Sequence, residues 1–280
     1  MARIESLNML TTEAGKAYLA ELYGTTIEGV MKSLVSAGMK NTELSGNPVA
    51  GSVEAKRFAN ATPQDYGTAR KNGKGDAVKA APITVAIDKD KEIVEELEEK
   101  DISLYGVEGV LDKRAKNHVI RMASALDTEF FQVAADAAVE VEVDLANSPI
   151  EDILETVIQE CENTQNEFVD GVPRELMHLT LNTGFYGKIR NNLDKQTRSN
   201  VDTAAEEFYS WHGVECKSCV HLPAGVPFIL QVTGAVAQPV MSDQYKAEKI
   251  PLSEAYGVEL FYHYGTKAVT PDLIFKPKQS

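Results

Sequence analysis

The chain has 280 residues, a formal net charge of −14 and three cysteines. The length allows one or two domains with a sizeable core. The negative charge argues against tight, non-specific nucleic-acid binding as the main function, because contacts to phosphate dominate that affinity. An odd number of cysteines argues against a disulfide framework and for a reducing compartment.

The N-terminal sequence shows no targeting signal. The first eight residues, MARIESLN, lack the apolar core of a secretory signal peptide. No apolar run approaches the roughly 20 residues of a membrane-spanning helix. We therefore expect a soluble protein that is made in the cytoplasm and does not contact a membrane.

The N-terminal 45 residues are expected to form an amphipathic arm. Thr26 is the candidate N-cap of a short helix that Gly38 stops, and the apolar face of this helix comprises Ile27, Val30, Met31, Leu34 and Val35. An earlier helical turn is expected around residues 17–23. The apolar face must pack against another surface, and the alternative is the first helical layer of a globular domain.

Residues 46–82 differ in composition, with five glycines and few large apolar side chains. Six basic residues against three acidic ones give a local charge of +3: Lys56, Arg57, Arg70, Lys71, Lys74 and Lys79 against Glu54, Asp65 and Asp76. The run Arg70-Lys71-Asn72-Gly73-Lys74-Gly75 has the turn chemistry of a hairpin tip. We expect an extended hairpin loop here, and the alternative is a surface loop without fixed structure.

A strand and an acidic segment follow. Ile83, Val85 and Ile87 alternate as in a β-strand. Residues 88–101 carry eight acidic residues against three lysines, a local charge of −5, and the apolar residues at 93, 94 and 97 fit one face of a short helix. A basic arm and an acidic platform in one chain are expected of a self-associating subunit, because opposite potentials orient an encounter. The alternative is a solvated acidic helix.

Residues 106–139 are predicted to form one long helix. Apolar residues recur along it at three- and four-residue steps, with Arg114 and His118 interrupting the stripe: Val107, Val110, Leu111, Met122, Leu126, Phe130, Val133 and Ala137. At 1.5 Å per residue the helix would be about 50 Å long, which suits a flat subunit that needs a stiff backbone. We expect Leu126 and Phe130 to pack against the following sheet, which begins with a strand at 139–145.

Residues 146–240 are expected to form a compact α+β domain. Ser148, Pro149 and Glu151 have the pattern of an N-cap, a first-turn proline and a capping box. The buried face of that helix comprises Ile150, Ile153, Leu154, Val157, Ile158 and Cys161. A strand at 177–181, a helix from Thr183 and a strand at 226–232 follow. The C-terminal segment predicts strands at 258–264 and 268–275, the second at a sheet edge or a pairing end because it contains Pro271.

The sharpest chemical motif is His212-x3-Cys216-x2-Cys219-x-His221, whose side chains are types that bind zinc. On a strand, however, Cys219 and His221 would share one face and Cys216 would lie on the other. We therefore expect ordinary thiols and histidines, with no metal and no cofactor. No nucleotide-binding loop or serine-nucleophile motif is present, so we expect no enzymatic activity. A zinc-dependent enzyme or binding module is the alternative.

Three stretches, and the order of the elements around them, carry a family resemblance. They are Val172-Pro173-Arg174-Glu175-Leu176 leading to Leu179-Thr180-Leu181-Asn182-Thr183-Gly184-Phe185-Tyr186, His212-Gly213-Val214-Glu215-Cys216 through Leu222-Pro223-Ala224-Gly225, and Tyr256-Gly257-Val258-Glu259 with Gly265-Thr266-Lys267. Over nearly its whole length the chain resembles the major capsid proteins of tailed bacteriophages, which have the Hong Kong 97-type fold. The resemblance implies an α+β fold with a long spine helix, a protruding β-hairpin arm, and axial and peripheral domains.

The resemblance also implies a domain organisation and a function. Its domains would be an N-terminal arm (1–45), an extended hairpin loop (46–82), a peripheral domain with the spine helix (83–145 and 241–280) and an axial domain (146–240). The chain would be a structural protein that self-assembles as pentamers and hexamers into an icosahedral shell around a phage genome, without binding the DNA specifically. The virion would be its location, after assembly in the host bacterial cytoplasm.

The interface residues follow from the local charge of the arm, and the other partners follow from the resemblance. Arg70, Lys71 and Lys74 are the candidate subunit-interface residues. Other partners would be a separate scaffolding protein, a portal and a decoration protein, and the short segment before the hairpin also allows an already trimmed chain. Residues 242–280 contain no asparagine, which argues against the lysine–asparagine cross-link that some family members form. An encapsulin-like compartment with enzyme cargo is the alternative of the same fold.

Overall fold

The computed structural model describes residues 6–72, 77–102, 104–195 and 209–278, which form two compact units. Unit 1 comprises Met1–Ala37, Ile87–Glu129 and Pro239–Gly265, and unit 2 comprises Gly38–Ala86, Phe130–Gln238 and Thr266–Ser280. Each unit is therefore assembled from three separate stretches of the chain. Among the described residues, no helix is both long and apolar enough to cross a membrane.

Unit 1 begins with one continuous amphipathic helix, α1 (Glu13–Ser33), which follows the short 3-10 helix η1 (Leu7–Thr11). Thr12 caps α1, because its hydroxyl accepts the amide hydrogen of Gly15 at 3.2 Å. The predicted N-cap at Thr26 is wrong. The Thr26 hydroxyl is buried inside the helix and donates to the Leu22 carbonyl, so the two predicted helical pieces are joined. Burial of a shared apolar face outweighs the weak helix propensity of the residues at 24–26.

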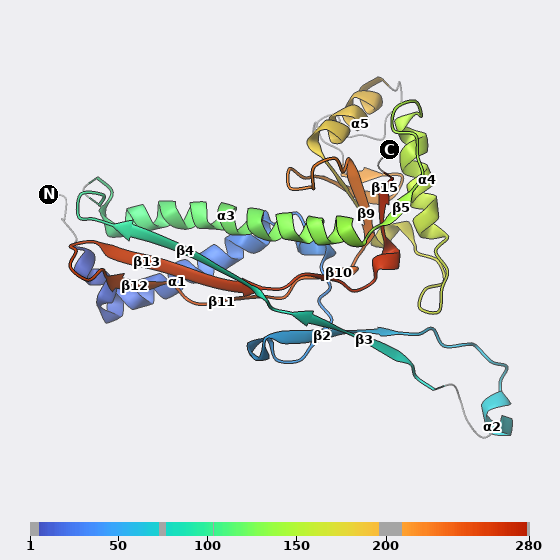
Figure 1. Cartoon of the computed structure of the whole chain (residues 1–280), viewed down its shortest axis with the longest axis horizontal. Coiled ribbons are helices and arrows are strands. Elements are labelled where there is room, and N and C mark those ends of the chain that lie inside the picture. Colours follow the sequence, from blue (N-terminus) through green and yellow to red (C-terminus); the bar gives the residue numbers. More distant parts are fainter. Residues whose placement is uncertain (1–5, 73–76, 103, 196–208, 279–280) are drawn as a thin grey trace. The chain divides into compact units, whose positions relative to one another are not determined.

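The predicted long helix is confirmed as α3 (Gly106–Ala137), the long green helix in Figure 1. Its 32 residues correspond to about 48 Å of helix. It contributes residues 106–129 to unit 1 and residues 130–137 to unit 2. Leu126 and Phe130 are both fully buried, as expected. Leu126 packs with Val30, Tyr262 and Tyr264 of unit 1, however, and not with the strand that follows the helix.

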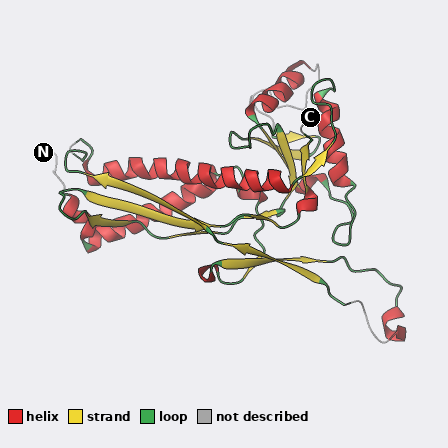
Figure 2. Ribbon diagram, viewed as in Figure 1, coloured by secondary structure: helices red, strands yellow, loops and turns green. Residues whose placement is uncertain are grey.

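The sheet of unit 1 is built around two long antiparallel strands, β4 (Lys89–Leu97) and β13 (Tyr256–Tyr264), which pair along nine residues (Figure 2). The predicted short helix in 88–101 is therefore wrong. Ile93, Glu95 and Leu97 point inward with the period of two that a strand requires, whereas Val94 is 52% exposed. The apolar pattern of this segment fits either a helix or a strand, and pairing with β13 favours the strand. The sheet is completed by β11 (Val240–Ser242) and β12 (Lys246–Lys249), which pair with β13.

A buried polar cluster in unit 1 explains the interruption of the α3 stripe. The guanidinium of Arg114 donates to the Glu95 carboxylate, with Nε at 2.8 Å from one oxygen. The His118 ring is 2% exposed and lies between Glu95, at 3.2 Å from Nε2, and the Tyr245 hydroxyl, at 2.8 Å from Nδ1. The inward-facing glutamate of β4 thus gives both polar residues of the stripe a partner.

Unit 2 contains a six-stranded mixed sheet with helices α4 (Ile150–Glu162) and α5 (Thr183–Lys195) packed on it. The pairs β5–β15 and β6–β8 are parallel, and the other neighbours are antiparallel. The strands lie in the order β5 (Val139–Val141), β15 (Ile274–Pro277), β9 (Phe228–Val232), β6 (Met177–Leu181), β8 (Val214–Ser218) and β7 (Ser210–Trp211). The predicted elements that became β6, α5 and β9 are confirmed, and the buried face of α4 is as expected.

Three local predictions in unit 2 are wrong. The strand expected at 139–145 ends at Val141. The capping box before α4 does not form, because Pro149 itself takes the cap position and no side chain caps the helix. The expected strand at 268–275 is two pieces, and Pro271 begins the 3-10 turn between them: β14 (Lys267–Ala268), η5 (Pro271–Leu273) and β15. Strand β15 lies between β5 and β9 and is not an edge strand.

Short elements complete unit 2. Strand β10 pairs with β14, and Lys40 forms an isolated parallel bridge with Val236. The bounds are η2 (Ala37–Met39), η3 (Pro48–Ala50), η4 (Arg174–Leu176) and β10 (Val236–Ala237).

Candidate assembly interface

The predicted hairpin is present as two antiparallel strands in register from Ser52↔Ala86 to Phe58↔Ala80 (Figures 1 and 2). Beyond these pairs one further bond, from the Ala59 amide to the Lys79 carbonyl at 3.0 Å, continues the ribbon. We call residues 52–86 the arm. Its strands are β2 (Ser52–Phe58) and β3 (Ala80–Ala86), with the short β1 (Leu44–Ser45) beside β2.

The base of the arm is attached to unit 2 by a small apolar core. Val53, Ala55 and Val85 pack with Ala237 and Val269, and all five are buried. The Lys267 ammonium donates to the Thr84 carbonyl at 2.9 Å. The inward side of β2 and β3 is therefore fixed at this end.

The outer part of the arm is largely exposed to solvent. Tyr66 is 95% exposed and Val78 is 86% exposed. Apolar side chains at this exposure are candidates for burial in a contact with another chain. The tip predicted at 70–75 begins not as a turn but as the short helix α2 (Thr68–Asn72).

The candidate interface residues lie in this outer part. Arg70 and Lys71 are exposed, and the Arg70 guanidinium lies over the Tyr66 ring at 5.9 Å. Lys74 lies outside the described residues. Two of the three cations are thus available on the surface of the arm for a contact.

Arg57 is not available in this way, although the sequence counts it among the basic residues of the arm. Its guanidinium donates two hydrogen bonds to the Asp272 carboxylate, at 2.7 and 2.6 Å. Burial raises the pKa of Asp272, but hydrogen bonds from Arg57 and Asn166 and the Arg57 charge outweigh it, so the pKa lies below its usual value. The charge of Arg57 is therefore compensated within unit 2.

The acidic segment forms the exposed face of β4. Glu92 and Glu96 lie on this face, with the half-exposed Val94 between them. Asp90 shares the face and pairs with His263 of β13 at 2.7 Å. Glu95 points the other way, and its hydrogen bond from Arg114 keeps its pKa below the usual value despite burial. We call Asp90, Glu92 and Glu96 the acidic face. It contains fewer acidic side chains than the local charge of −5 suggests.

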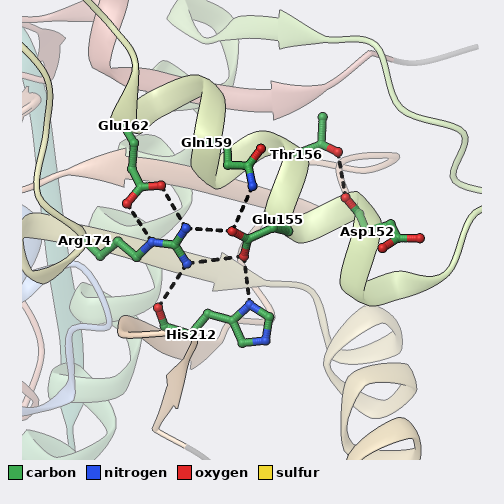
Figure 3. Close-up of polar contacts among 7 residues, drawn as sticks. All are labelled: Asp152, Glu155, Thr156, Gln159, Glu162, Arg174 and His212. Carbon is green, nitrogen blue, oxygen red and sulfur yellow. Dashed lines mark hydrogen bonds and ion pairs between the residues drawn. The ribbon is translucent and has the colours of Figure 1, made fainter.

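A second charged cluster, the Arg174 clamp, lies in unit 2 (Figure 3). The Arg174 guanidinium bridges Glu155 and Glu162 of α4, with donor–acceptor distances of 2.7 Å to each, and donates to the His212 carbonyl at 3.2 Å. His212 itself contacts Glu155 at 2.8 Å. Hydrogen bonds from Arg174 and His212 lower the pKa of Glu155 to about 2. Both carboxylates are thus ionised and engaged, which suits a structural clamp better than acid–base catalysis.

The predicted Cys/His motif is dispersed over different surroundings. Cys216 lies in the apolar core on β8, and burial raises its pKa to about 12. The Cys219 sulfur accepts the His221 amide hydrogen at 3.3 Å, and His212 is held by Glu155. Among the described residues, no three His, Cys, Asp or Glu side chains are grouped so that they could hold a metal ion. Cys161 is buried in the core, as predicted.

Sequence reasoning missed both arginine contacts. Glu155 and Glu162 are seven residues apart on α4, so they share a helix face, and this spacing could have indicated a bridging cation. Arg57 and Asp272 are 215 residues apart, and no local pattern indicates their pairing. The base of the arm packs against Val269, two residues before η5, and this tertiary contact brings Asp272 beside the arm.

Comparison with known proteins identifies the fold. No protein-family model and no curated protein sequence matches the chain. A chain from Mycobacterium phage Che8 matches with a TM-score of 0.67 at 17% identity, covering 88% of this chain and 91% of that one. The capsid structure of cyanophage P-SCSP1u matches with a TM-score of 0.61 at 12% identity, covering 86% and 85%.

A virus-like particle from Pyrococcus furiosus matches with a TM-score of 0.55 at 13% identity, covering 92% of this chain and 98% of that chain. These matches cover 86–92% of this chain and 85–98% of the matched chains, so most of the architecture is shared. The chain has the Hong Kong 97-type fold of tailed-bacteriophage major capsid proteins.

Proposed function

We propose that this protein is the major structural subunit of an icosahedral phage capsid. The observation that carries the proposal is the match to phage capsid structures over most of the length of both chains, 88% and 91% in one comparison. The exposed arm supports it, because a long ribbon with little core of its own gains from lying on a neighbouring subunit. The net charge of −14 suits a shell that encloses DNA without adhering to it.

We further propose that the arm of one copy contacts the acidic face of a neighbouring copy. Arg70 and Lys71 supply positive charge on the arm, and Glu92 and Glu96 supply negative charge on the acidic face. Tyr66 and Val94 supply exposed apolar surface beside each set of charges. Such complementarity acts mainly on the rate and the register of association, and salt weakens it over a Debye length of about 8 Å.

Electron microscopy of the purified protein tests the main proposal. Uniform closed particles are expected under assembly conditions, with the free subunit as the starting species. A protein that stays monomeric at every salt and protein concentration would overturn the proposal. Portal, scaffolding and decoration proteins would be partners of the assembly in the host cytoplasm, and co-purification from infected cells tests them.

Charge reversal tests the arm contact. Arg70→Glu with Lys71→Glu should slow assembly strongly, while the melting temperature of the free subunit stays unchanged because both side chains are exposed. Mixing this variant with a Glu92→Lys, Glu96→Lys variant should restore assembly, because opposite charges meet again. Normal assembly by the arm variant alone would contradict the contact, and so would a mixture that assembles no better than either variant.

A compartment that encloses proteins is the second candidate, because one match is a virus-like particle. The contents of shells purified from the native host separate the two functions. DNA of uniform length supports the capsid, whereas a stoichiometric protein cargo supports the compartment.

A further inference from the structure

Three chain segments converge where the arm leaves its apolar base. Arg57 of β2 forms its two hydrogen bonds with Asp272 in η5, and its guanidinium lies over the Phe168 ring at 4.4 Å. Asn166 donates to the same Asp272 carboxylate at 2.6 Å. The side chain of Arg57 is only 14% exposed and that of Asp272 is 30% exposed. This group, Arg57, Asn166, Phe168 and Asp272, is called the arm latch below.

The loop that supplies Asn166 and Phe168 is itself rigidly built. The Asn166 side-chain oxygen accepts the backbone amide hydrogens of Phe168 and Val169, at 2.8 and 3.0 Å. The backbone amide of Asn166 donates to the Val169 carbonyl. Gly171, with φ of +84°, returns the chain, and its amide donates to the Thr164 carbonyl at 3.0 Å.

Directly after this loop the Arg174 clamp fastens the chain back onto α4 (Figure 3). The loop at 163–172 is therefore a bracket that is closed at its base and presents Asn166 and Phe168 to the arm. Its position depends on α4, which packs in the core of unit 2.

The other side of the latch is tied to the sheet. Asp272 lies in η5, which immediately precedes β15, and β15 is hydrogen-bonded to a strand on each side. The bracket adds one backbone bond further along the arm, from the Asn60 amide to the Glu167 carbonyl at 2.9 Å. Residues beyond this point in the arm are largely exposed up to α2 and again at 77–80.

The arm thus has two attachment points in unit 2, the apolar base around Val53 and Val85 and the latch around Arg57. A two-stranded ribbon twists and bends easily when it is held at one end only. A second attachment, near the outer end of the paired strands, fixes the direction in which the exposed part leaves the subunit. A small change of angle there becomes a large displacement at the tip.

We propose that the arm latch sets the direction of the arm and thereby the geometry with which one subunit reaches the next. This inference rests on the proposed capsid function for its consequence, but the latch itself is a property of the single subunit. Arg57 and Asp272 are positioning residues in this proposal, and the contact with the neighbour is made by the outer arm.

The test combines hydrogen exchange on the free subunit with microscopy of assembly products. In Arg57→Ala, exchange at 57–60 and 79–81 should become at least about tenfold faster, since breaking a part-buried pair held by two hydrogen bonds destabilises locally by more than the 1.4 kcal/mol of a tenfold change. Exchange in β6 and β9 should stay unchanged. Assembly should yield irregular particles or particles of mixed size in place of uniform shells. Lys56→Ala, an exposed neighbour on the same strand, is the matched control and should behave as wild type.

Asp272→Ala must reproduce the effect from the other partner, and the double variant must be less affected than the sum of the two single variants, because both remove the Arg57–Asp272 contact. Wild-type exchange in Arg57→Ala overturns the latch. Faster arm exchange with normal uniform shells overturns its role in assembly. If Arg57→Ala loosens the whole of unit 2, Arg57→Lys replaces it, and faster exchange confined to the arm is again required. If the wild-type protein forms no shells, the capsid proposal fails, while the exchange result still decides the latch.

Discussion

Truncating Phe130 offers a direct measure of how much shell formation protects the subunit. The Phe130 side chain is fully buried, its ring lies edge-on to Phe131 at a centroid distance of 5.2 Å, and the Lys40 ammonium lies 6.0 Å from its centroid. Replacing a buried phenylalanine by alanine costs about 3–5 kcal/mol, and the aromatic pair accounts for roughly 0.5–1.5 kcal/mol of such a loss. This is a large share of the roughly 5–15 kcal/mol that stabilises a domain.

We therefore expect Phe130→Ala to lower the melting temperature of the free subunit by roughly 6–20 °C, at about 2–4 °C per kcal/mol. In a closed shell, binding to neighbours favours the folded subunit, so the shift for assembled particles should be smaller. Calorimetry of free subunits and of shells, for wild type and variant, gives both shifts. Phe58→Ala, which removes the same atoms from a side chain that is 56% exposed, is the control and should change the free subunit little.

Equal shifts in free subunits and shells would refute the stabilising role of assembly. An unchanged melting temperature of the free Phe130→Ala subunit would show that the side chain is not part of the core. This second result would require a different register for the C-terminal half of α3.

Three further predictions concern buried polar groups. Asp127→Ala should lower the free energy of unfolding by about 3 kcal/mol in denaturant titration. The buried carboxylate accepts hydrogen bonds from the Val35 amide and from the amide and hydroxyl of Ser36, and these bonds would be lost. Asp136→Ala, at an exposed position of the same helix, should have almost no effect. Burial lowers the pKa of His118 in the folded protein, so on acidification the histidine of the unfolded chain is protonated first. The free energy of unfolding should therefore fall as the pH drops through about 6.5 toward the folded pKa. His118→Gln should lack this part of the pH dependence. Burial raises the pKa of Cys161 and Cys216 to about 12, so a thiol reagent at pH 8 should label these two cysteines only after unfolding. Rapid labelling of the native protein would contradict this expectation. A chelator should leave the melting temperature unchanged.

The elements that sequence reasoning placed correctly are those with a strong local period. The stripe along α3, the buried face of α4 and the alternating strand that became β13 each repeat a pattern that only one secondary structure satisfies. The arm was found by composition, since glycines and charged residues without apolar partners cannot form a core. Its tip was only partly right, because α2 replaces the first part of the expected turn.

The errors have one physical origin, which is that the deciding partner is distant in the sequence. Residues 88–101 became β4 because β13, some 160 residues later, offers nine pairing partners to a segment whose own pattern fits either structure. Pro271 does not mark an edge strand because the turn at η5 precedes β15, which β5 and β9 then enclose. Thr26 could not act as a cap because the helix has a buried apolar face on both sides of it, Leu19 and Leu22 in one core cluster and Val30 and Leu34 in another.

The sequence by itself determined the long helix, the position of the arm and the acidic segment, because periodicity and composition are local or additive properties. Only the tertiary structure decided which charges are available for a contact. Some charges are paired within the subunit: Arg57 with Asp272, Glu95 with Arg114 and His118, and Asp90 with His263. The side chains of Arg70, Lys71, Glu92 and Glu96 lie on exposed faces. A charge becomes part of a surface or of a core according to which segments the sheets bring beside it, and the sheet order depends on free energies summed over the whole chain.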